Sequence, residues 1–255
     1  MNISLCTKSD WEHPAENPNR LKLLKDIAAI FRDCLRNPSS LDDAKITVAR
    51  SSSGPLHSKT SFTPRESVIY IDSHPRDWCK HVYQFAHEFI HFLAESESKA
   101  SDGRHYHNLW FEETLCEVGS LFALREYDEK SDGRVQHTEN DYRDYLTRIA
   151  KCPGRVWNSD SLEDWLRRNR DVLVKTRIND ENTARPLQWQ AADKLLPLFT
   201  SNPIGWNAVL TLNTDPDQRA SIPFEKYLLN WFHSAPNCDK GFIRSIALDF
   251  GVNIT

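Results

Sequence analysis

Residues 86–93 read AHEFIHFL, and this segment constrains the fold of the chain more than any other. It lies within a longer apolar-periodic stretch, residues 75–97, which predicts a single helix. Residues four apart on a helix are separated by about 40° around its axis, so His87 and His91 project from the same face. The chain must therefore fold so that an otherwise apolar helix holds two imidazoles beside the carboxylate of Glu88.

This spacing is the H-E-x-x-H arrangement of zinc peptidases. Two imidazoles on one helical face can reach a single tetrahedral Zn²⁺ at about 2.0–2.1 Å, while Glu88 lies beside that face and acts on water. With ten histidines in 255 residues, a chance H-E-x-x-H is expected only about 0.02 times. The alternative is a core helix whose histidines only form hydrogen bonds. We interpret His87 and His91 as metal ligands and Glu88 as the general base.

A catalytic zinc ion keeps three protein ligands and one open position, so a third ligand must follow in the chain. The metzincin pattern requires Gly at position 94 and His at position 97, but Ala94 and Glu97 stand there, which excludes that branch. About twenty residues beyond the first motif, residues 110–117 read WFEETLCE. They lie in a second predicted helix, residues 108–126, and offer carboxylates as candidate ligands.

With this second motif the chain resembles the gluzincin zinc metallopeptidases, whose glutamate helix has the pattern W-x-x-E-x-x-x-[DE]. The resemblance implies that Glu113 is the third zinc ligand and that Glu117 orients a ligand histidine, as a supporting carboxylate does. Glu112 stays open as the alternative ligand, and a solvated glutamate face is the non-functional alternative. Cys116 is interpreted as a small residue that allows close helix packing, because as a fourth ligand it would close the metal to water.

The resemblance covers about residues 44–127 and implies an α+β fold, in which a small twisted sheet and the active-site helix form a zincin-like catalytic region. Strands are predicted at residues 45–50 and 67–72. One of these two strands is expected to hold an extended substrate along the cleft edge. We expect the zincin-like region to span residues 1–130 and a mainly helical lobe, residues 131–255, to complete the cleft.

Further helices are indicated by apolar periodicity and by capping residues. Capping-type starts lie at Thr138 and Ser161. The other predicted helices cover residues 18–36, 186–200, 203–212, 222–234 and 239–249.

The resemblance also implies an activity, that of a zinc-dependent peptidase with one zinc ion per chain. The G-x-M-E-N motif of related aminopeptidases cannot be present, because the only methionine is Met1, and this favours an endopeptidase. Two alternatives stay open: a selective protease that cleaves one regulatory protein, and an inactive zincin-fold protein that serves as a binding module.

Peptide-bond hydrolysis also needs a donor to the developing oxyanion. Tyr106 lies in the loop between the two motifs and is the candidate for this catalytic role. Other donors near the motifs are His105, His107, Tyr142 and Tyr145.

Composition limits the partners of the chain. Thirty-two Lys and Arg against 36 Asp and Glu give a net charge of −4, so there is no electrostatic reason to expect nucleic acid or an anionic membrane. A mean hydropathy of −0.60 and the lack of a signal sequence predict a cytoplasmic protein, with signal-independent export left open. The six cysteines form no CxxC pair and are expected to be mostly reduced thiols. A peptide or protein substrate is the expected partner, and the oligomeric state is not predicted.

Overall fold

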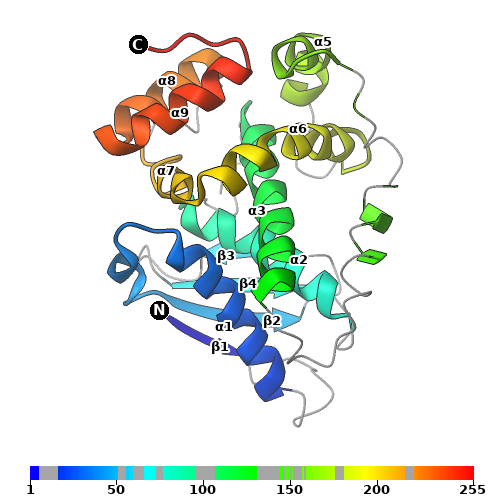
Figure 1. The fold of residues 1–255 in the computed structure, drawn as a ribbon, viewed down its shortest axis with the longest axis vertical. Helices are drawn as coiled ribbons and strands as arrows, with labels where there is room; N and C mark the ends of the chain where they lie inside the picture. The colour runs from blue at the N-terminus through cyan, green and yellow to red at the C-terminus, as the bar shows by residue number, and fades with distance from the viewer. Residues whose placement is uncertain are drawn as a thin grey trace. The chain divides into compact units, whose positions relative to one another are not determined.

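The protein is described from a computed structural model (Figure 1), in which the fold is mixed α and β and mostly helical. The chain forms two compact units: Met1–Lys99 with Gly119–Arg148, and Ala100–Val118 with Ile149–Thr255. The domain boundary expected at residue 130 stays a prediction. The described residues are 1–5, 17–50, 56–59, 66–72, 77–95, 107–130, 144–145, 147–149, 151, 157, 159–175, 181–215 and 221–255.

The first unit contains a four-stranded sheet in the order β1-β2-β4-β3. Strands β1 (Asn2–Leu5), β2 (Lys45–Arg50) and β4 (Glu66–Ile71) are parallel, whereas β3 (Leu56–Lys59) is antiparallel to β4. The two predicted strands are confirmed as β2 and β4, whereas β1 and β3 are not evident from the sequence. Since β2 and β4 both lie inside the sheet, the expectation that one of them forms the cleft edge is wrong. The edge strands of the described sheet are β1 and β3.

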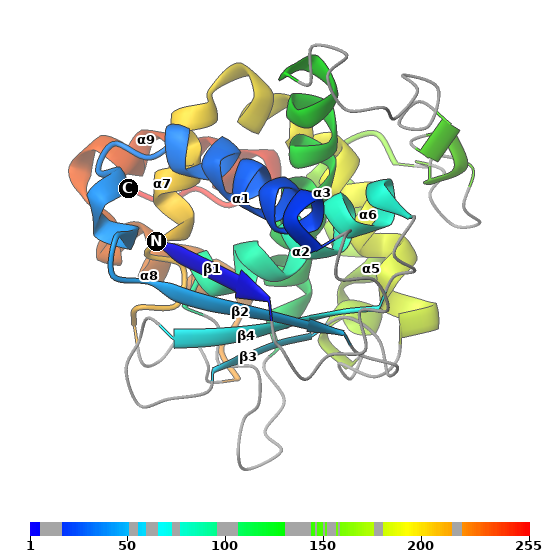
Figure 2. The same ribbon diagram turned by 90° about the horizontal axis from the view of Figure 1, so that it is seen from below.

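One face of the sheet is buried. Ile46 and Val48 of β2 are buried, as are Ile69 and Ile71 of β4, and they alternate with less buried residues. Val48 lies opposite Ile69 in the β2–β4 register. This alternation is that of strands with one face on the core. The buried face is covered by α1 (Asn17–Asp33) and α2 (Trp78–Leu93) (Figure 2).

Helix α1 joins the parallel strands β1 and β2, as parallel neighbours need a crossover connection. Its Phe31 is fully buried and packs on Phe89 of α2, with 5.7 Å between ring centroids. The same ring lies 5.8 Å from that of Phe122, which belongs to α3 (Leu109–Lys130). Phe31 therefore anchors the helical layer that carries the first motif.

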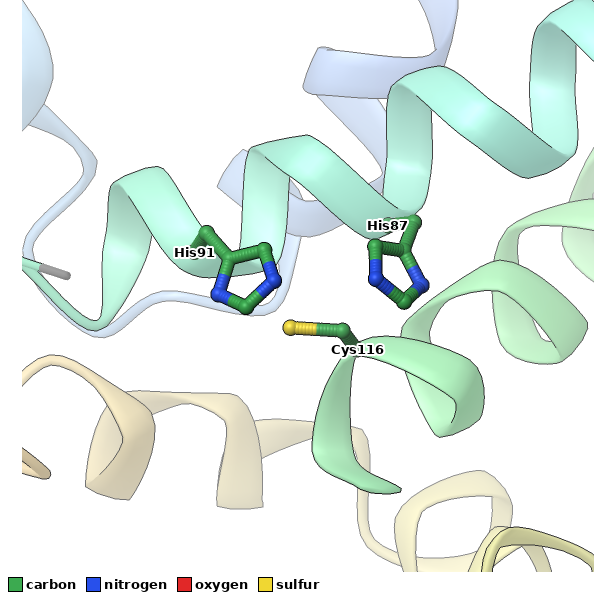
Figure 3. Close-up of side chains that lie close together, drawn as sticks. All are labelled: His87, His91 and Cys116. Atoms are coloured by element: carbon green, nitrogen blue, oxygen red, sulfur yellow. The ribbon is translucent and has the colours of Figure 1, made fainter. Parts of the chain in front are cut away.

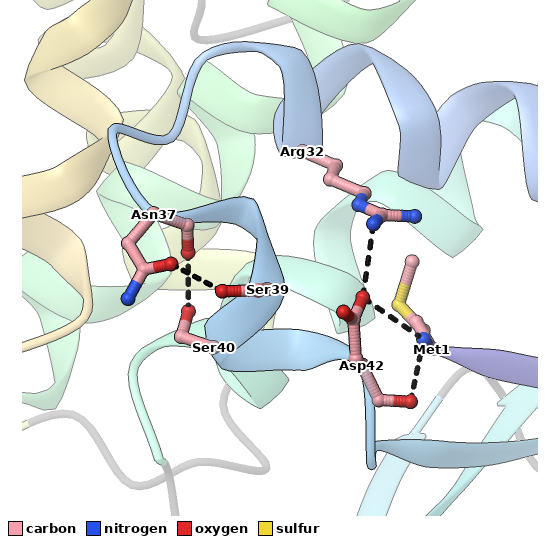
Figure 4. A network of polar contacts seen from close by, with 6 residues as sticks. All are labelled: Met1, Arg32, Asn37, Ser39, Ser40 and Asp42. Carbon is pink, nitrogen blue, oxygen red and sulfur yellow. Dashed lines mark hydrogen bonds and ion pairs between the residues drawn. The ribbon is translucent and has the colours of Figure 1, made fainter.

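Polar contacts hold the connection between α1 and β2 (Figure 4). Arg32 of α1 donates to the Asp42 carboxylate at 2.9 Å, and the Met1 amino group donates to the Asp42 carbonyl at 2.7 Å. The Ser40 hydroxyl donates to the Asn37 carbonyl at 2.8 Å within the turn at η1 (Pro38–Leu41). These bonds tie the end of α1 and the start of β1 to the turn that leads into β2.

The second unit is helical. It includes the first part of α3, together with α5 (Leu162–Lys175), α6 (Glu181–Ser201), η2 (Pro203–Gly205), α7 (Trp206–Val209), α8 (Phe224–Ser234) and α9 (Asn237–Asp249). The predicted start at Ser161 is confirmed, because its Oγ accepts the Asp164 N–H at 3.1 Å. The helix predicted at residues 203–212 is confirmed in part, since residues 203–209 are helical but form the two short elements η2 and α7. The start predicted at Thr138 lies outside the described residues. None of the described helices combines the length and apolar character of a membrane span.

Aromatic rings dominate the interior of the second unit. Trp110 lies 4.8 Å from Phe224 between ring centroids, and Phe111 lies 5.2 Å from the same ring. The Trp231 indole is fully buried, and its N–H donates to the Ala208 carbonyl at 2.8 Å. Aromatic pairs at such separations add to the free energy gained from burial alone.

Candidate metal centre

Helix α2 carries the H-E-x-x-H motif inside the protein. Its residues from His81 to Leu93 are all buried, including the three polar residues of the motif. His87 and His91 are each 8% exposed and Glu88 is 4% exposed. The two imidazole rings lie 5.2 Å apart between centroids. As the helical periodicity predicts, one face of α2 holds both imidazoles with the carboxylate beside them.

A cysteine of α3 lies against these two histidines. One ligand atom from each of His87, His91 and Cys116 lies within 4.8 Å of the others. Figure 3 shows both imidazoles directed from α2 toward the Cys116 side chain on α3. One turn further along α3, the Ser120 hydroxyl donates to the Tyr83 carbonyl of α2 at 2.9 Å. This hydrogen bond joins α3 to α2 one turn away from Cys116.

The donor set suits a transition metal. Imidazole nitrogen and cysteine sulfur are the usual protein ligands of zinc, and sulfur disfavours magnesium and calcium. In a tetrahedral zinc site, neighbouring N and S ligand atoms are about 3.3–3.6 Å apart. The group lies within 4.8 Å, so closure around an ion requires ligand movements of at most about 1.5 Å. The His87, His91 and Cys116 group can therefore hold a metal ion.

The glutamates of α3 lie apart from this group. Within the described residues, neither Glu113 nor Glu117 belongs to it. Glu113 is half-buried, while Glu117 is 1% exposed and lies 3.7 Å from the Arg185 guanidinium. The Glu112 carboxylate accepts the Asn213 amide N–H at 2.9 Å. The ligand role of Glu113, the orienting role of Glu117 and the alternative ligand Glu112 stay predictions.

Two further residues beside the motif, Cys116 and Gln84, were not predicted as functional from the sequence. Cys116 was considered only as a packing residue or as a fourth ligand. Gln84 precedes His87 by three residues and Glu88 by four, so it shares their helical face. It is 7% exposed, and its Oε1 has no hydrogen-bond partner in the described structure. Helical spacing alone could have drawn attention to Gln84.

The candidate oxyanion donors are only partly covered by the structure. Tyr106, His105 and Tyr142 lie outside the described residues, so their roles stay predictions. His107 is half-buried at the start of the described segment. Tyr145 packs edge-on against Tyr83 of α2, with 6.1 Å between ring centroids.

Four cysteines fall within the described residues, and they are present as thiols: Cys34, Cys79, Cys116 and Cys238. Cys79 lies on α2 and is buried, as Cys116 is, but it is not in the described ligand group. Cys116 is thus distinguished from the other buried thiol by its position next to the two imidazoles.

No protein-family model and no curated protein sequence matches this chain. The resemblance to gluzincins therefore rests on the two motifs alone. What the structure adds to it is the buried His-His-Cys group, which can hold a metal ion.

Proposed function

We propose that this protein is a zinc-dependent peptidase in which His87 and His91 hold the metal and Glu88 is the general base. The observation that carries the proposal is the buried H-E-x-x-H face of α2, with a third donor atom within 4.8 Å of the two imidazoles. A structural zinc site requires no carboxylate beside the histidines, whereas hydrolysis requires a base at that position.

Glu88 performs the proton transfers in this proposal. A bound zinc ion supplies Lewis acidity, which polarises the peptide carbonyl and the attacking water. A Glu88 carboxylate oxygen takes a proton from the water during attack and delivers it to the nitrogen of the leaving amine. Since Glu88 is only 4% exposed, bulk water competes little for this carboxylate.

The supporting roles come from the resemblance and from the sheet order. Glu117 is proposed to orient a ligand histidine, and Tyr106 is proposed to donate to the oxyanion. The outer edge of β3 pairs with no other described strand. We assign an extended peptide substrate to that edge, where its backbone can add to the sheet.

The decisive experiment compares the native protein with Glu88→Gln on a tryptic peptide library, with new termini read by mass spectrometry. Zinc-loaded native protein is expected to cut peptides internally. The substitution should lower the cleavage rate by about 10²–10⁴-fold and leave zinc content unchanged. Glu129→Gln, at an exposed position of α3, is the matched control and should cleave like the native protein.

Two results would contradict the proposal. Equal cleavage by the native and Glu88→Gln proteins would remove the general-base role. A native protein that is fully loaded with zinc and cuts no peptide would favour the binding-module alternative.

A further inference from the structure

We propose that the Cys116 thiolate, and not the Glu113 carboxylate, is the third protein ligand of the metal held by His87 and His91. This inference rests on the proposed function for the claim that the histidine pair binds zinc. It changes the donor set from two imidazoles and a carboxylate to two imidazoles and a sulfur.

The inference rests on the position of Cys116 next to the two histidines. Ser120 meets the carbonyl of Tyr83, and His87 is one turn beyond Tyr83 along α2. Cys116 lies one turn before Ser120 along α3, and its sulfur lies within 4.8 Å of a ring nitrogen of each histidine. Glu113 precedes Cys116 by three residues, which moves its Cα about 4.5 Å further along the axis of α3.

Burial also favours Cys116 over Glu113 as the third ligand. Cys116 is fully buried beside the two imidazoles, each of which is 8% exposed. Glu113 is only half-buried and lies outside the described ligand group. A thiolate carries the same single negative charge as a carboxylate, so Cys116 balances the charge of the ion equally well.

Ligand count agrees with a catalytic role. With Cys116 as the third ligand and not an additional fourth, the metal has three protein ligands, and its remaining tetrahedral position stays open. Cys116 would close the metal to water only as a fourth ligand, that is, if Glu113 also binds. Because sulfur is a soft ligand, this set also favours zinc over magnesium and calcium.

Zinc X-ray absorption on the native, zinc-loaded protein tests the donor set without any substitution. The expected result is one sulfur at about 2.3 Å and nitrogen ligands at about 2.0–2.1 Å. A shell that contains only nitrogen and oxygen would overturn the inference while leaving the zinc peptidase proposal standing. Failure to bind zinc at all would overturn both.

Cobalt substitution then identifies the sulfur. Co²⁺-loaded native protein should show a thiolate-to-cobalt charge-transfer absorption, and Glu113→Gln and Cys79→Ser should retain it. Cys116→Ser should lose the band and bind Co²⁺ more than about 100-fold more weakly, with circular dichroism checking its fold. A band that persists in Cys116→Ser, or one that Glu113→Gln abolishes, would contradict the assignment.

Discussion

The buried side chains of α2 and those of the second unit are of different kinds. Helix α2 buries three histidines and a glutamate, each less than a tenth exposed. The second unit buries aromatic rings, and two of its indole N–H groups donate to Gln190 and Ala208. The motif face of α2 thus holds two imidazoles and a carboxylate close together. The second unit buries mainly apolar rings, and its buried carboxylates Glu112 and Glu117 contact Asn213 and Arg185.

This difference indicates that the aromatic rings mainly stabilise the fold, whereas the motif face of α2 has another role. Burial of aromatic surface lowers the free energy of the folded state, and ring pairs add to it. Burial of ionisable groups raises that free energy unless they are paired or bind a metal. We infer that the aromatic rings of the second unit contribute strongly to stability, while the motif face of α2 serves the proposed metal binding and catalysis.

The largest effect on stability is expected in the aromatic interior. Phe199 is fully buried and lies 4.3 Å from Trp206 and 4.9 Å from Phe242 between ring centroids. Phe199→Ala should lower the free energy of unfolding by about 3–5 kcal/mol in urea titrations. Ile204→Ala, at a site 42% exposed, should change it by less than about 0.5 kcal/mol. If Phe199→Ala also abolishes zinc binding in the folded fraction, the aromatic core and the metal site are not independent of each other.

Two buried glutamines give the next comparison, because Gln84 and Gln190 are each 7% exposed. Gln190 accepts the Trp165 indole N–H at 2.9 Å, whereas the Oε1 of Gln84 lacks a hydrogen-bond partner among the described residues. Gln190→Met should destabilise the protein by about 1–3 kcal/mol, because it leaves a buried donor unsatisfied. Gln84→Met should be neutral or stabilising. Thermal unfolding checks both variants, and equal losses would contradict the contrast between the interiors.

A smaller effect is expected at the surface of the second unit, where Ser161 caps α5 through the Asp164 N–H. Ser161→Ala should cost about 1 kcal/mol, since one N–H of the first turn loses its acceptor. Ser161→Asp keeps an acceptor and is the control for chemical denaturation. A loss as large as that of Phe199→Ala would mean that local capping, and not the aromatic interior, dominates this unit.

Tyr127 should make the stability depend on pH only in alkaline solution. Burial, and then the negative charge of Asp26, raise the Tyr127 pKa from 10.0 to about 12. Between these values the unfolded chain releases the phenolic proton while the folded protein keeps it. The stabilising contribution is therefore complete below pH 10 and is lost as the pH rises toward 12. Urea unfolding at pH 9 and pH 11 should show a smaller loss for Tyr127→Phe than for the native protein, and identical losses would contradict this pKa.

Much of the first unit can be predicted from the sequence, since its signals are local and strong. The helical period of α2 and the β-branched residues of β2 and β4 were sufficient to predict these elements. Strands β1 and β3 have four residues each. So short a strand has too few alternating positions to stand out, and its pairing depends on neighbours distant in sequence.

The third ligand shows the limit of such prediction at the site. Periodicity along α3 indicates which residues share a helical face, and Glu113 and Cys116, three apart, do so. It does not determine how far α3 slides along α2. That displacement depends on packing such as the Ser120–Tyr83 hydrogen bond, and it decides which side chain is level with the histidines.

Zinc content tests the central claim most directly. The purified native protein and His87→Ala are both supplied with zinc and then freed of excess metal. Elemental analysis then measures the zinc content of each per chain. The account predicts close to one zinc ion per native chain and little or none in the variant, because a two-ligand site binds weakly. A native protein that retains no zinc after this treatment would contradict the account.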